Sequence, residues 1–399
     1  MYKVLMIPDC YYQNHSGAIA ARAAAKLFIQ LNCEVRIFTT ETVDLNLEPQ
    51  CMTYSRKAYS WKANFFTNEY AHEYENILTD FSPDLIFIFG GIVNKPKYYT
   101  EVAKKRGIKV AIFLLVQDFY CANLHAALED EPCFKCVESS FPNSFLHNCA
   151  VKSSIFPPAF LLNYSIIRKH IHTSLVSADF VISSTDEQLK LLQVYGVDSN
   201  KLIKCPLFFD EKRVQKFKAS KGDYLVVSGQ FRREKGLQLL PEIINAIEAP
   251  VKIKIPFYNQ KEANKAVQLF ALQKYIDLGI IETLPNVTWE NGGEELLAKS
   301  FGVINPTIWP TTTEFVLLET LGYGKPIFTF AVGIHNELIQ NDKNGFAAPI
   351  RAYKQMAKQI QKVYADEGLY STISSGAFQL YADMTNHETF LDGLRCLLN

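Results

Sequence analysis

Short, fully apolar segments alternate with amphipathic ones along nearly the whole chain. In the first half the apolar segments include Lys3–Pro8, Asp84–Phe89 and Lys109–Val116, each about the length of one strand. Strands that are apolar on both faces are typical of a parallel sheet covered by helices on both sides. Helices are predicted between such segments, for example at Ala18–Leu31 and Glu187–Tyr195. The pattern therefore predicts an α/β protein built on parallel sheets.

A polar, lysine-rich stretch without clear periodicity, Phe208–Asp223, interrupts this alternation. The strands predicted after it are Tyr224–Ser228, Val251–Ile255, Val287–Trp289, Gly302–Asn305 and Pro326–Phe330. We therefore predict two Rossmann-like domains, residues 1–212 and residues 213–375. The segment 376–399 contains an amphipathic helix, His387–Leu398, which we expect to pack back on the first domain.

The length of the chain, 399 residues, suits two domains. Lys plus Arg and Asp plus Glu both number 41, so the net charge is zero and provides no long-range attraction to nucleic acid. The N-terminus becomes polar too soon for a signal peptide, and no apolar run approaches the roughly 20 residues of a membrane span. We expect a cytoplasmic protein with no nucleic-acid partner.

One stretch, Tyr54–Phe66, interleaves basic and aromatic residues. Such a composition occurs at lipid interfaces, in grooves that bind an acceptor, and on partly buried helices whose Lys stems are solvated. A peripheral contact with the inner face of the membrane is therefore one of three interpretations of this stretch.

The strongest signal for chemistry lies in the second domain, directly after a predicted strand. Asn305-Pro306 is followed by a loop with Thr311 and Glu314, and then by a helix that carries Glu319. Ligands of open parallel sheets bind beyond the carboxyl ends of the strands, where helix N-termini favour anions such as diphosphates. A carboxylate one turn into such a helix, Glu319, can accept hydrogen bonds from ribose hydroxyls. The alternative is a helix carboxylate that only faces solvent.

A second helix is predicted to begin near the same place. Gly324-Lys325-Pro326 leads into the next strand, and Gly333 then opens a helix that carries His335. Two helix N-termini would therefore converge on one anion site, with Gly333 and His335 as candidate donor contacts.

The first strand of the second domain ends in a glycine and a cluster of cations. Gly229 follows the strand, and Arg232, Arg233 and Lys235 follow shortly after it. A departing diphosphate gains charge in the transition state of a transfer reaction, so fixed cations beside it lower the barrier. The three cations are candidate catalytic residues and Gly229 is a candidate donor contact. The alternative is a solvated basic turn.

Two loops of the first domain follow strands in the same way. Gly17 opens an alanine-rich helix, and a glycine there lets a ligand approach the backbone. Gln117 and Asp118 follow the apolar run that ends at Val116, and both are candidate catalytic residues. For Asp118 the alternative is an ordinary helix N-cap.

Together these motifs resemble family 4 of the retaining glycosyltransferases, which has the GT-B fold. Glu319 matches the second glutamate of the family's Glu-x7-Glu signature, which holds the nucleotide ribose. Gly324-Lys325-Pro326 matches the Gly-x-Pro that follows it, and Gly333 matches the turn before the next helix. Lys235 matches the family's lysine beside the diphosphate. The resemblance is specific in the second domain and loose in the first.

The chain departs from the family at three matched positions. Thr311 stands at the first glutamate of the signature, Gln230 at an arginine beside the diphosphate, and Gln117 at a histidine that approaches the donor sugar. Gln117 keeps a hydrogen-bonding role but cannot transfer a proton. Arg232 or Arg233 would take the place of the missing arginine.

The resemblance implies two Rossmann-like domains that face each other across a cleft, with a nucleotide-sugar donor, a UDP- or GDP-sugar, on the second. It also implies a glycan, lipid-linked or protein acceptor on the first domain, retention of anomeric configuration, and no cofactor required for catalysis. Polysaccharide or glycan assembly is the expected setting. A catalytically impaired scaffold of another transferase stays open, because it would account for all three departures. A sugar-nucleotide epimerase stays open as well, although its acid and base residues are not evident.

Four of the nine cysteines, Cys121, Cys133, Cys136 and Cys149, cluster in the segment 121–149. The C-x2-C pair is the usual first half of a tetrahedral thiolate site, and two further thiols would complete it. A zinc ion held by four thiolates would be structural, since it keeps no open position for chemistry. Buried free thiols are the alternative.

Overall fold

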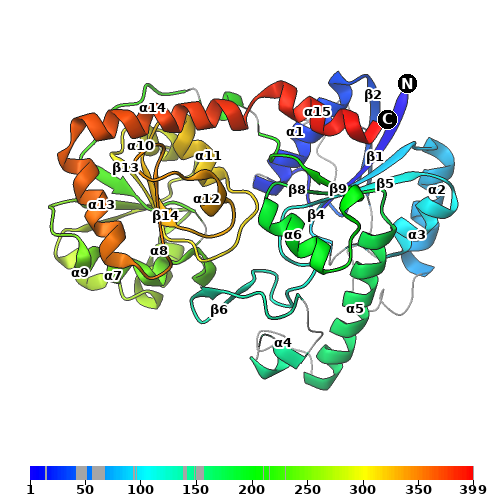
Figure 1. Ribbon diagram of the computed structural model, residues 1–399, viewed down its shortest axis with the longest axis horizontal. Coiled ribbons are helices and arrows are strands. Elements are labelled where there is room, and N and C mark those ends of the chain that lie inside the picture. The colour runs from blue at the N-terminus through cyan, green and yellow to red at the C-terminus, as the bar shows by residue number, and fades with distance from the viewer. Residues whose placement is uncertain are drawn as a thin grey trace.

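Two parallel β-sheets, one in each half of the chain, form the framework of the computed structural model (Figure 1). The structure describes residues 1–13, 16–41, 52–55, 68–92, 95, 97–137, 142–147, 149, 157–209, 211–214, 216–229 and 231–398. The predicted α/β class with two Rossmann-like domains is confirmed by these sheets. Gln230 and most of the stretch Tyr54–Phe66 lie outside the described residues.

The sheet of the N-terminal domain has seven strands in the order β3-β2-β1-β4-β5-β8-β9. These are β1 (Tyr2–Pro8), β2 (Cys33–Thr39), β3 (Met52–Ser55), β4 (Leu85–Gly90), β5 (Lys109–Leu114), β8 (Phe180–Ser183) and β9 (Leu202–Lys204). The helices that cover it are α1 (Ser16–Gln30), α2 (Asn68–Phe81), α3 (Lys97–Lys105), α5 (Pro157–Ser177) and α6 (Asp186–Val194). All six residues of β4 are buried, as a strand apolar on both faces requires.

The sheet of the C-terminal domain has six strands in the order β12-β11-β10-β13-β14-β15. These are β10 (Tyr224–Val226), β11 (Lys252–Phe257), β12 (Ile281–Pro285), β13 (Gly302–Asn305), β14 (Ile327–Phe330) and β15 (Phe346–Ala348). Its helices are α7 (Leu240–Ala246), α8 (Gln260–Leu269), α9 (Gln273–Asp277), α10 (Gly293–Ala298), α11 (Phe315–Gly322), α12 (Gly333–Leu338) and α13 (Tyr353–Ala365). The short 3-10 helices η4 (Arg233–Lys235) and η5 (Leu237–Leu239) precede α7.

The strand predicted at Val287–Trp289 is wrong. The strand at this edge is β12, which pairs in parallel with β11 and ends at Pro285. Beyond it the chain turns, because the amides of Asn291 and Gly293 both donate to the carbonyl of Thr288. The apolar side chains of this loop are therefore free to face the space between the domains rather than a neighbouring strand.

The C-terminal helices return the chain to the first domain. Helix α14 (Glu367–Met384) lies along the C-terminal domain, and α15 (His387–Leu398) lies beside α1 of the N-terminal domain (Figure 1). Phe390 and Leu394 of α15 are buried, and the Phe390 ring meets the Phe208 ring edge-on at 5.8 Å. The amphipathic face of this helix therefore completes the core of the N-terminal domain.

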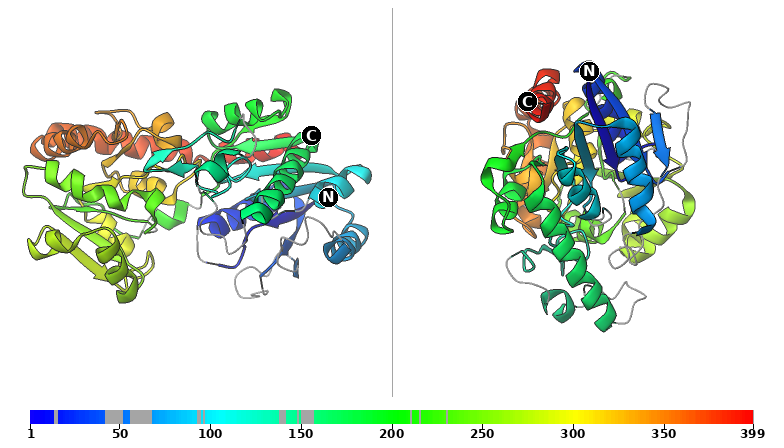
Figure 2. Two further views of the ribbon diagram at one scale, coloured as in Figure 1. Left: turned by 90° about the horizontal axis from the view of Figure 1, so that it is seen from below. Right: turned by 90° about the vertical axis from the view of Figure 1, so that its right-hand side faces the viewer.

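A hairpin from the N-terminal domain also contacts the C-terminal domain. Its strands, β6 (Ala127–Leu128) and β7 (Glu131–Pro132), lie below the junction of the two domains in Figure 1. Asp130 at its tip accepts two hydrogen bonds of 2.9 Å from the guanidinium of Arg233, and the Glu129 carbonyl accepts one of 2.7 Å from Arg351. The left view of Figure 2 shows the two domains side by side.

Within the part of the chain that the structure describes, no helix has the length and apolar character needed to cross a membrane.

Candidate functional site

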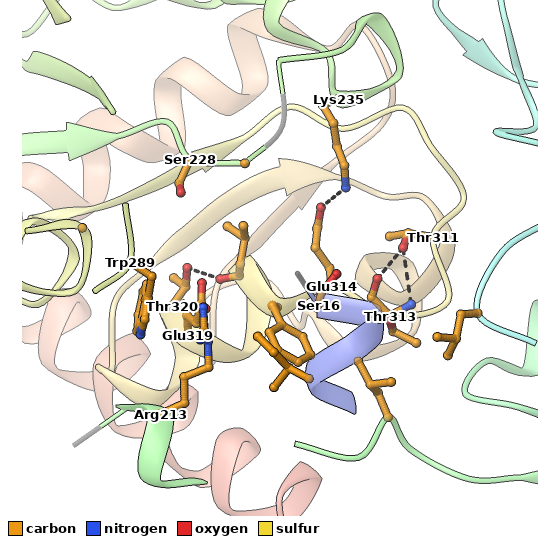
Figure 3. Close-up of a pocket in the computed structure, with 18 of the residues that line it drawn as sticks. Ser16, Arg213, Ser228, Lys235, Trp289, Thr311, Thr313, Glu314, Glu319 and Thr320 are labelled. Carbon is orange, nitrogen blue, oxygen red and sulfur yellow. Dashed lines mark hydrogen bonds and ion pairs between the residues drawn. The ribbon is translucent and has the colours of Figure 1, made fainter. Parts of the chain in front are cut away.

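A pocket of about 390 Å³ lies between the two domains, within the usual size range of small-molecule sites. Several predicted site residues line it, namely Gly17, Gly229, Lys235, Thr311, Glu314 and Glu319. The N-terminal domain contributes the end of β1 and the start of α1, and the C-terminal domain contributes the ends of β10 and β13 and the start of α11 (Figure 3). The pocket thus lies beyond the carboxyl ends of strands of both sheets, as expected for parallel α/β domains.

Glu319 lies on α11 at the base of the pocket, and only 8% of its side chain is exposed. Its Oε1 accepts a hydrogen bond of 2.7 Å from Nε of Arg213, which comes from the connection between the domains (Figure 3). Burial raises the pKa of Glu319, and Arg213 counteracts part of that shift. A partly desolvated carboxylate with a fixed orientation is a strong acceptor for hydroxyl groups.

Lys235 and Glu314 form an ion pair on the opposite side of the pocket (Figure 3). Glu314 is the N-cap residue of α11, and its Oε2 also accepts from the Asn305 amide at 2.6 Å and meets Nε2 of His335 at 2.7 Å. Burial opposes ionisation of Glu314, but Lys235 and His335 outweigh it, so the pKa of Glu314 lies well below its usual value. The cation nearest the predicted diphosphate position is thus held by a buried anion.

The N-terminus of the second predicted helix, α12, forms a hydrogen bond within the protein and does not face the pocket. The amide of Ile334, in the first turn of α12, donates to the Thr311 carbonyl at 2.9 Å. Gly333 has a φ of +51°, and a Cβ there would come within 2.4 Å of the same carbonyl oxygen. His335 is fully buried on Glu314, so neither Gly333 nor His335 lines the pocket. The α12 end therefore supports the Thr311 loop, and α11 is the helix whose N-terminus faces the pocket.

The two arginines of the basic cluster lie away from the pocket lining. Arg233 is bound by Asp130 of the hairpin, with 68% of its side chain exposed. Arg232 is also largely exposed, 3.8 Å from a carboxylate oxygen of Glu234. Of the three cations selected from the sequence, Lys235 is the one that lines the pocket.

Gln117 and Asp118 are both buried behind the pocket wall. The Gln117 side chain donates to the Pro310 carbonyl at 2.9 Å and accepts from the Gln188 amide at 3.2 Å. Nearby, the Thr312 hydroxyl donates to the Leu115 carbonyl at 2.9 Å. In this arrangement Gln117 fixes the loop that carries Thr311 against the N-terminal domain.

Among the pocket residues that were not selected from the sequence, Asp9, Arg213 and Trp289 stand out because a ligand could contact their charged or aromatic groups. Asp9 lines the N-terminal side, where buried Lys95 and the Gly91 amide bind its carboxylate. Trp289 lines the C-terminal side, and the guanidinium of Arg213 lies 4.9 Å from its ring centre. Asp9 follows β1 directly, so the strand-end rule that selected Gly17 could have found it. Arg213 and Trp289 lie in segments without a recognisable motif.

An apolar end of the pocket is formed by side chains from the end of β11, from the loops after β11 and β12, and from α10. They are Pro256, Tyr258, Val287, Trp289 and Leu297. Because Trp289 lies beside Glu319 (Figure 3), this end offers a flat, apolar ligand group a place next to the ribose position.

The four clustered cysteines stay free thiols in the structure, and Cys121 and Cys136 are buried. Burial raises the pKa of Cys121 to about 12, and Cys121 Sγ accepts a hydrogen bond of 3.3 Å from the Ala126 amide. Among the described residues, which include all four cysteines, no three His, Cys, Asp or Glu side chains are placed to hold a metal ion. The structural zinc stays a prediction.

The two sheets, the interdomain pocket and the returning C-terminal helix define the GT-B fold. The same arrangement occurs in sucrose-phosphate synthase from Thermosynechococcus elongatus (TM-score 0.70, 14% identity, 100% of this chain and 98% of that chain covered). It also occurs in HepE from Anabaena, solved with UDP and glucose (TM-score 0.68, 14% identity, 100% of this chain and 99% of that chain covered). A third example is a mutant of TarM from S. aureus, solved with UDP, fondaparinux and alpha-GlcNAc-glycerol (TM-score 0.64, 12% identity, 100% of both chains covered).

Residues 222–366 match the family described as glycosyl transferases group 1. This segment contains the predicted site residues of the second domain that line the pocket, namely Gly229, Lys235, Thr311, Glu314 and Glu319. The second domain therefore matches the glycosyl transferases group 1 family, and the whole chain shares its GT-B fold with glycosyltransferases of known structure. No curated protein matches the sequence.

Proposed function

We propose that the protein transfers a glycosyl group, with retention of anomeric configuration, from a nucleoside diphosphate sugar to an acceptor hydroxyl. The observation that carries this proposal is the presence of Glu319 and Lys235 in one interdomain pocket. Glu319 supplies a fixed carboxylate for the ribose, and Lys235 supplies a cation for the diphosphate. The apolar end beside Trp289 would take the base of the nucleotide.

In the proposed reaction the bond between the anomeric carbon and the diphosphate oxygen breaks, and a bond from that carbon to the acceptor oxygen forms on the same face. The acceptor proton passes to the departing phosphate oxygen. Lys235 and the N-terminus of α11 stabilise the charge that the diphosphate gains. Lys235 must then exchange Glu314 for the diphosphate, so donor binding reorganises this ion pair.

We place the acceptor on the N-terminal side of the pocket. Asp9, Ser16 and Gly17 line that side, and the carboxylate of Asp9 is oriented by Lys95 and the Gly91 amide. A carboxylate has about four acceptor positions, so Asp9 can still receive a hydrogen bond from an acceptor hydroxyl. We propose a glycan or lipid-linked acceptor in polysaccharide or glycan assembly, in the cytoplasm at the inner face of the membrane.

The first test is thermal-shift binding with UDP, GDP and ADP and their common sugar conjugates. UDP is the first choice because the HepE and TarM structures contain it. A ligand at 100 times its Kd adds about 2.7 kcal/mol to the free energy of unfolding. Glu319→Gln should remove the shift. The matched control is Glu295→Gln, a carboxylate exposed to solvent on α10 of the same domain.

The second test is transfer from the donor that the panel selects to a panel of glycan and lipid-linked acceptors. Lys235→Ala should lower the rate by about 10²–10³-fold, the usual effect of removing one preorganised charge contact. Lys299→Ala, which removes an exposed lysine of the same domain, should leave the rate unchanged. Absence of a shift with every nucleotide would contradict the proposal and favour a scaffold without catalysis. Formation of the opposite anomer would contradict retention.

A further inference from the structure

The connection between the domains contributes a guanidinium to the base of the pocket. Arg213 lies in the 3-10 helix η3 (Glu211–Val214), and Figure 3 shows its side chain directed at Glu319. Resting on the function proposed above, we propose that Arg213 is a positioning residue for the donor ribose. It keeps the Glu319 carboxylate ionised and aimed at the ribose hydroxyls.

The surroundings of Glu319 explain why it needs such a partner. It is buried on α11, and two further carboxylates act on it electrostatically, Glu290 from the loop after β12 and Glu294 from the first turn of α10. Burial and these two charges raise the pKa of Glu319, whereas Arg213 lowers it. A protonated Glu319 would hold a proton on one oxygen and would be a weaker acceptor for ribose. Arg213 therefore favours the ionised form of Glu319.

The contact leaves room for a ligand. Nε of Arg213 donates one hydrogen bond of 2.7 Å to Oε1 of Glu319. The terminal Nη1 of Arg213 lies 3.8 Å from a carboxylate oxygen of Glu290. A carboxylate has about four acceptor positions, so the two ribose hydroxyls can bind while Arg213 stays in place. Both Arg213 and Glu319 line the same pocket, which puts the pair within reach of the donor.

Two aromatic rings fix the guanidinium. Its central carbon lies 4.9 Å from the ring centre of Trp289 and 5.5 Å from that of Phe315, and 18% of the side chain is exposed. A planar guanidinium stacks on such rings and donates sideways at the same time, which a lysine ammonium does not do equally well. Lysine at position 213 should therefore preserve the charge but lose part of the alignment.

The experiment measures the affinity for UDP and for 2′,3′-dideoxy-UDP by calorimetry between pH 6 and pH 9, or for the matching GDP pair if the panel selects GDP. The wild type should prefer the ribonucleotide by about tenfold to hundredfold across this range, as expected for hydrogen bonds to a charged group. Arg213→Gln should lose most of the preference at pH 6 and less of it at pH 9, because removal of Arg213 favours the protonated form of Glu319. Glu319→Gln should show no preference at any pH, and Arg213→Lys should be intermediate.

Lys216→Gln is the matched control, because it removes an exposed cation from the same connection. It should keep the wild-type preference at every pH. A wild-type preference in Arg213→Gln at pH 6 would overturn the inference. An equal loss of affinity for both nucleotides at every pH would also overturn it, because that result describes a structural role. Wild-type protein that binds neither nucleotide would overturn the proposed function itself, which separates the two failures.

Discussion

Lys235 and Glu314 form an ion pair inside the pocket, and Glu314 is held in turn by His335 at 2.7 Å and by Asn305 at 2.6 Å. The candidate diphosphate cation thus has a buried anion as its partner before any donor arrives. Glu314 is three positions from Thr311, where the related family has its first signature glutamate, and it is in contact with the lysine. A diphosphate bound at Lys235 would therefore also meet the negative charge of Glu314.

The substitution Glu314→Gln should strengthen UDP binding by about tenfold. Two negative charges about 6 Å apart repel by roughly 3 kcal/mol at an effective dielectric constant of 20, and solvent reduces that value. The affinity for uridine, which lacks phosphates, should not change. Calorimetry with both ligands measures the difference. Weaker UDP binding in this variant would instead mean that Glu314 orients Lys235 for the diphosphate.

The same substitution should change how stability depends on pH. The pKa of Glu314 is lowered in the folded protein, so its ionisation stabilises the fold above the unfolded pKa, near 4.3. That contribution is lost as the pH falls below the unfolded pKa towards the folded one. We therefore expect Glu314→Gln to have a lower free energy of unfolding than the wild type at pH 7. The difference between the two proteins should be smaller at pH 3.

Urea unfolding at pH 7, 5 and 3 measures these differences in the free energy of unfolding. Glu295→Gln, which changes an exposed carboxylate of the same domain, should show nearly the same stability as the wild type throughout. A gap between Glu314→Gln and the wild type that stays constant from pH 7 to pH 3 would contradict the prediction.

The hairpin contact between Asp130 and Arg233 should influence the arrangement of the domains more than the stability of either. Exposed ion pairs contribute about 0–1 kcal/mol, so Asp130→Ala should barely change the melting temperature. It should raise the KM for the donor and enlarge the radius of gyration measured by X-ray scattering. Glu282→Ala, which removes an exposed ion pair within the C-terminal domain, is the control. An unchanged radius of gyration and KM would show that the hairpin does not hold the domains.

Much of the fold could be predicted from the sequence because its central strands are apolar on both faces. β1, β4, β5, β13 and β14 were found in this way. The edge strands β3, β9 and β15 are short and were missed, since β3 and β9 include polar residues and β15 ends in two alanines, which have little preference for strands. β12 was misplaced by a few residues because Glu282 and Thr283 interrupt its apolar pattern, whereas Val287 and Trp289 form an alternating pattern just after it.

The candidate site was predictable where glycine and proline mark strand ends and helix starts. Glu319 and Lys235 were selected for that reason, and both line the pocket. Arg213 could not be selected, because its partner Glu319 is 106 residues away and the contact depends on how the domains are joined. Likewise, nothing in the basic cluster itself indicates that Asp130 binds Arg233 from the other domain.

The substitution Gly333→Ala should destabilise the C-terminal domain and weaken donor binding together. At a φ of +51° any side chain is strained, and a Cβ would meet the Thr311 carbonyl at 2.4 Å, so the loop that lines the pocket must move. Gly107→Ala is the matched control, because Gly107 has a φ of +72° and open space around it. We expect the free energy of unfolding to fall by about 1 kcal/mol in the control and by about 2–4 kcal/mol in Gly333→Ala. UDP binding should weaken in Gly333→Ala alone. Equal losses in urea unfolding, with unchanged UDP affinity in both variants, would show that the loop tolerates the displacement and that α12 does not support the pocket.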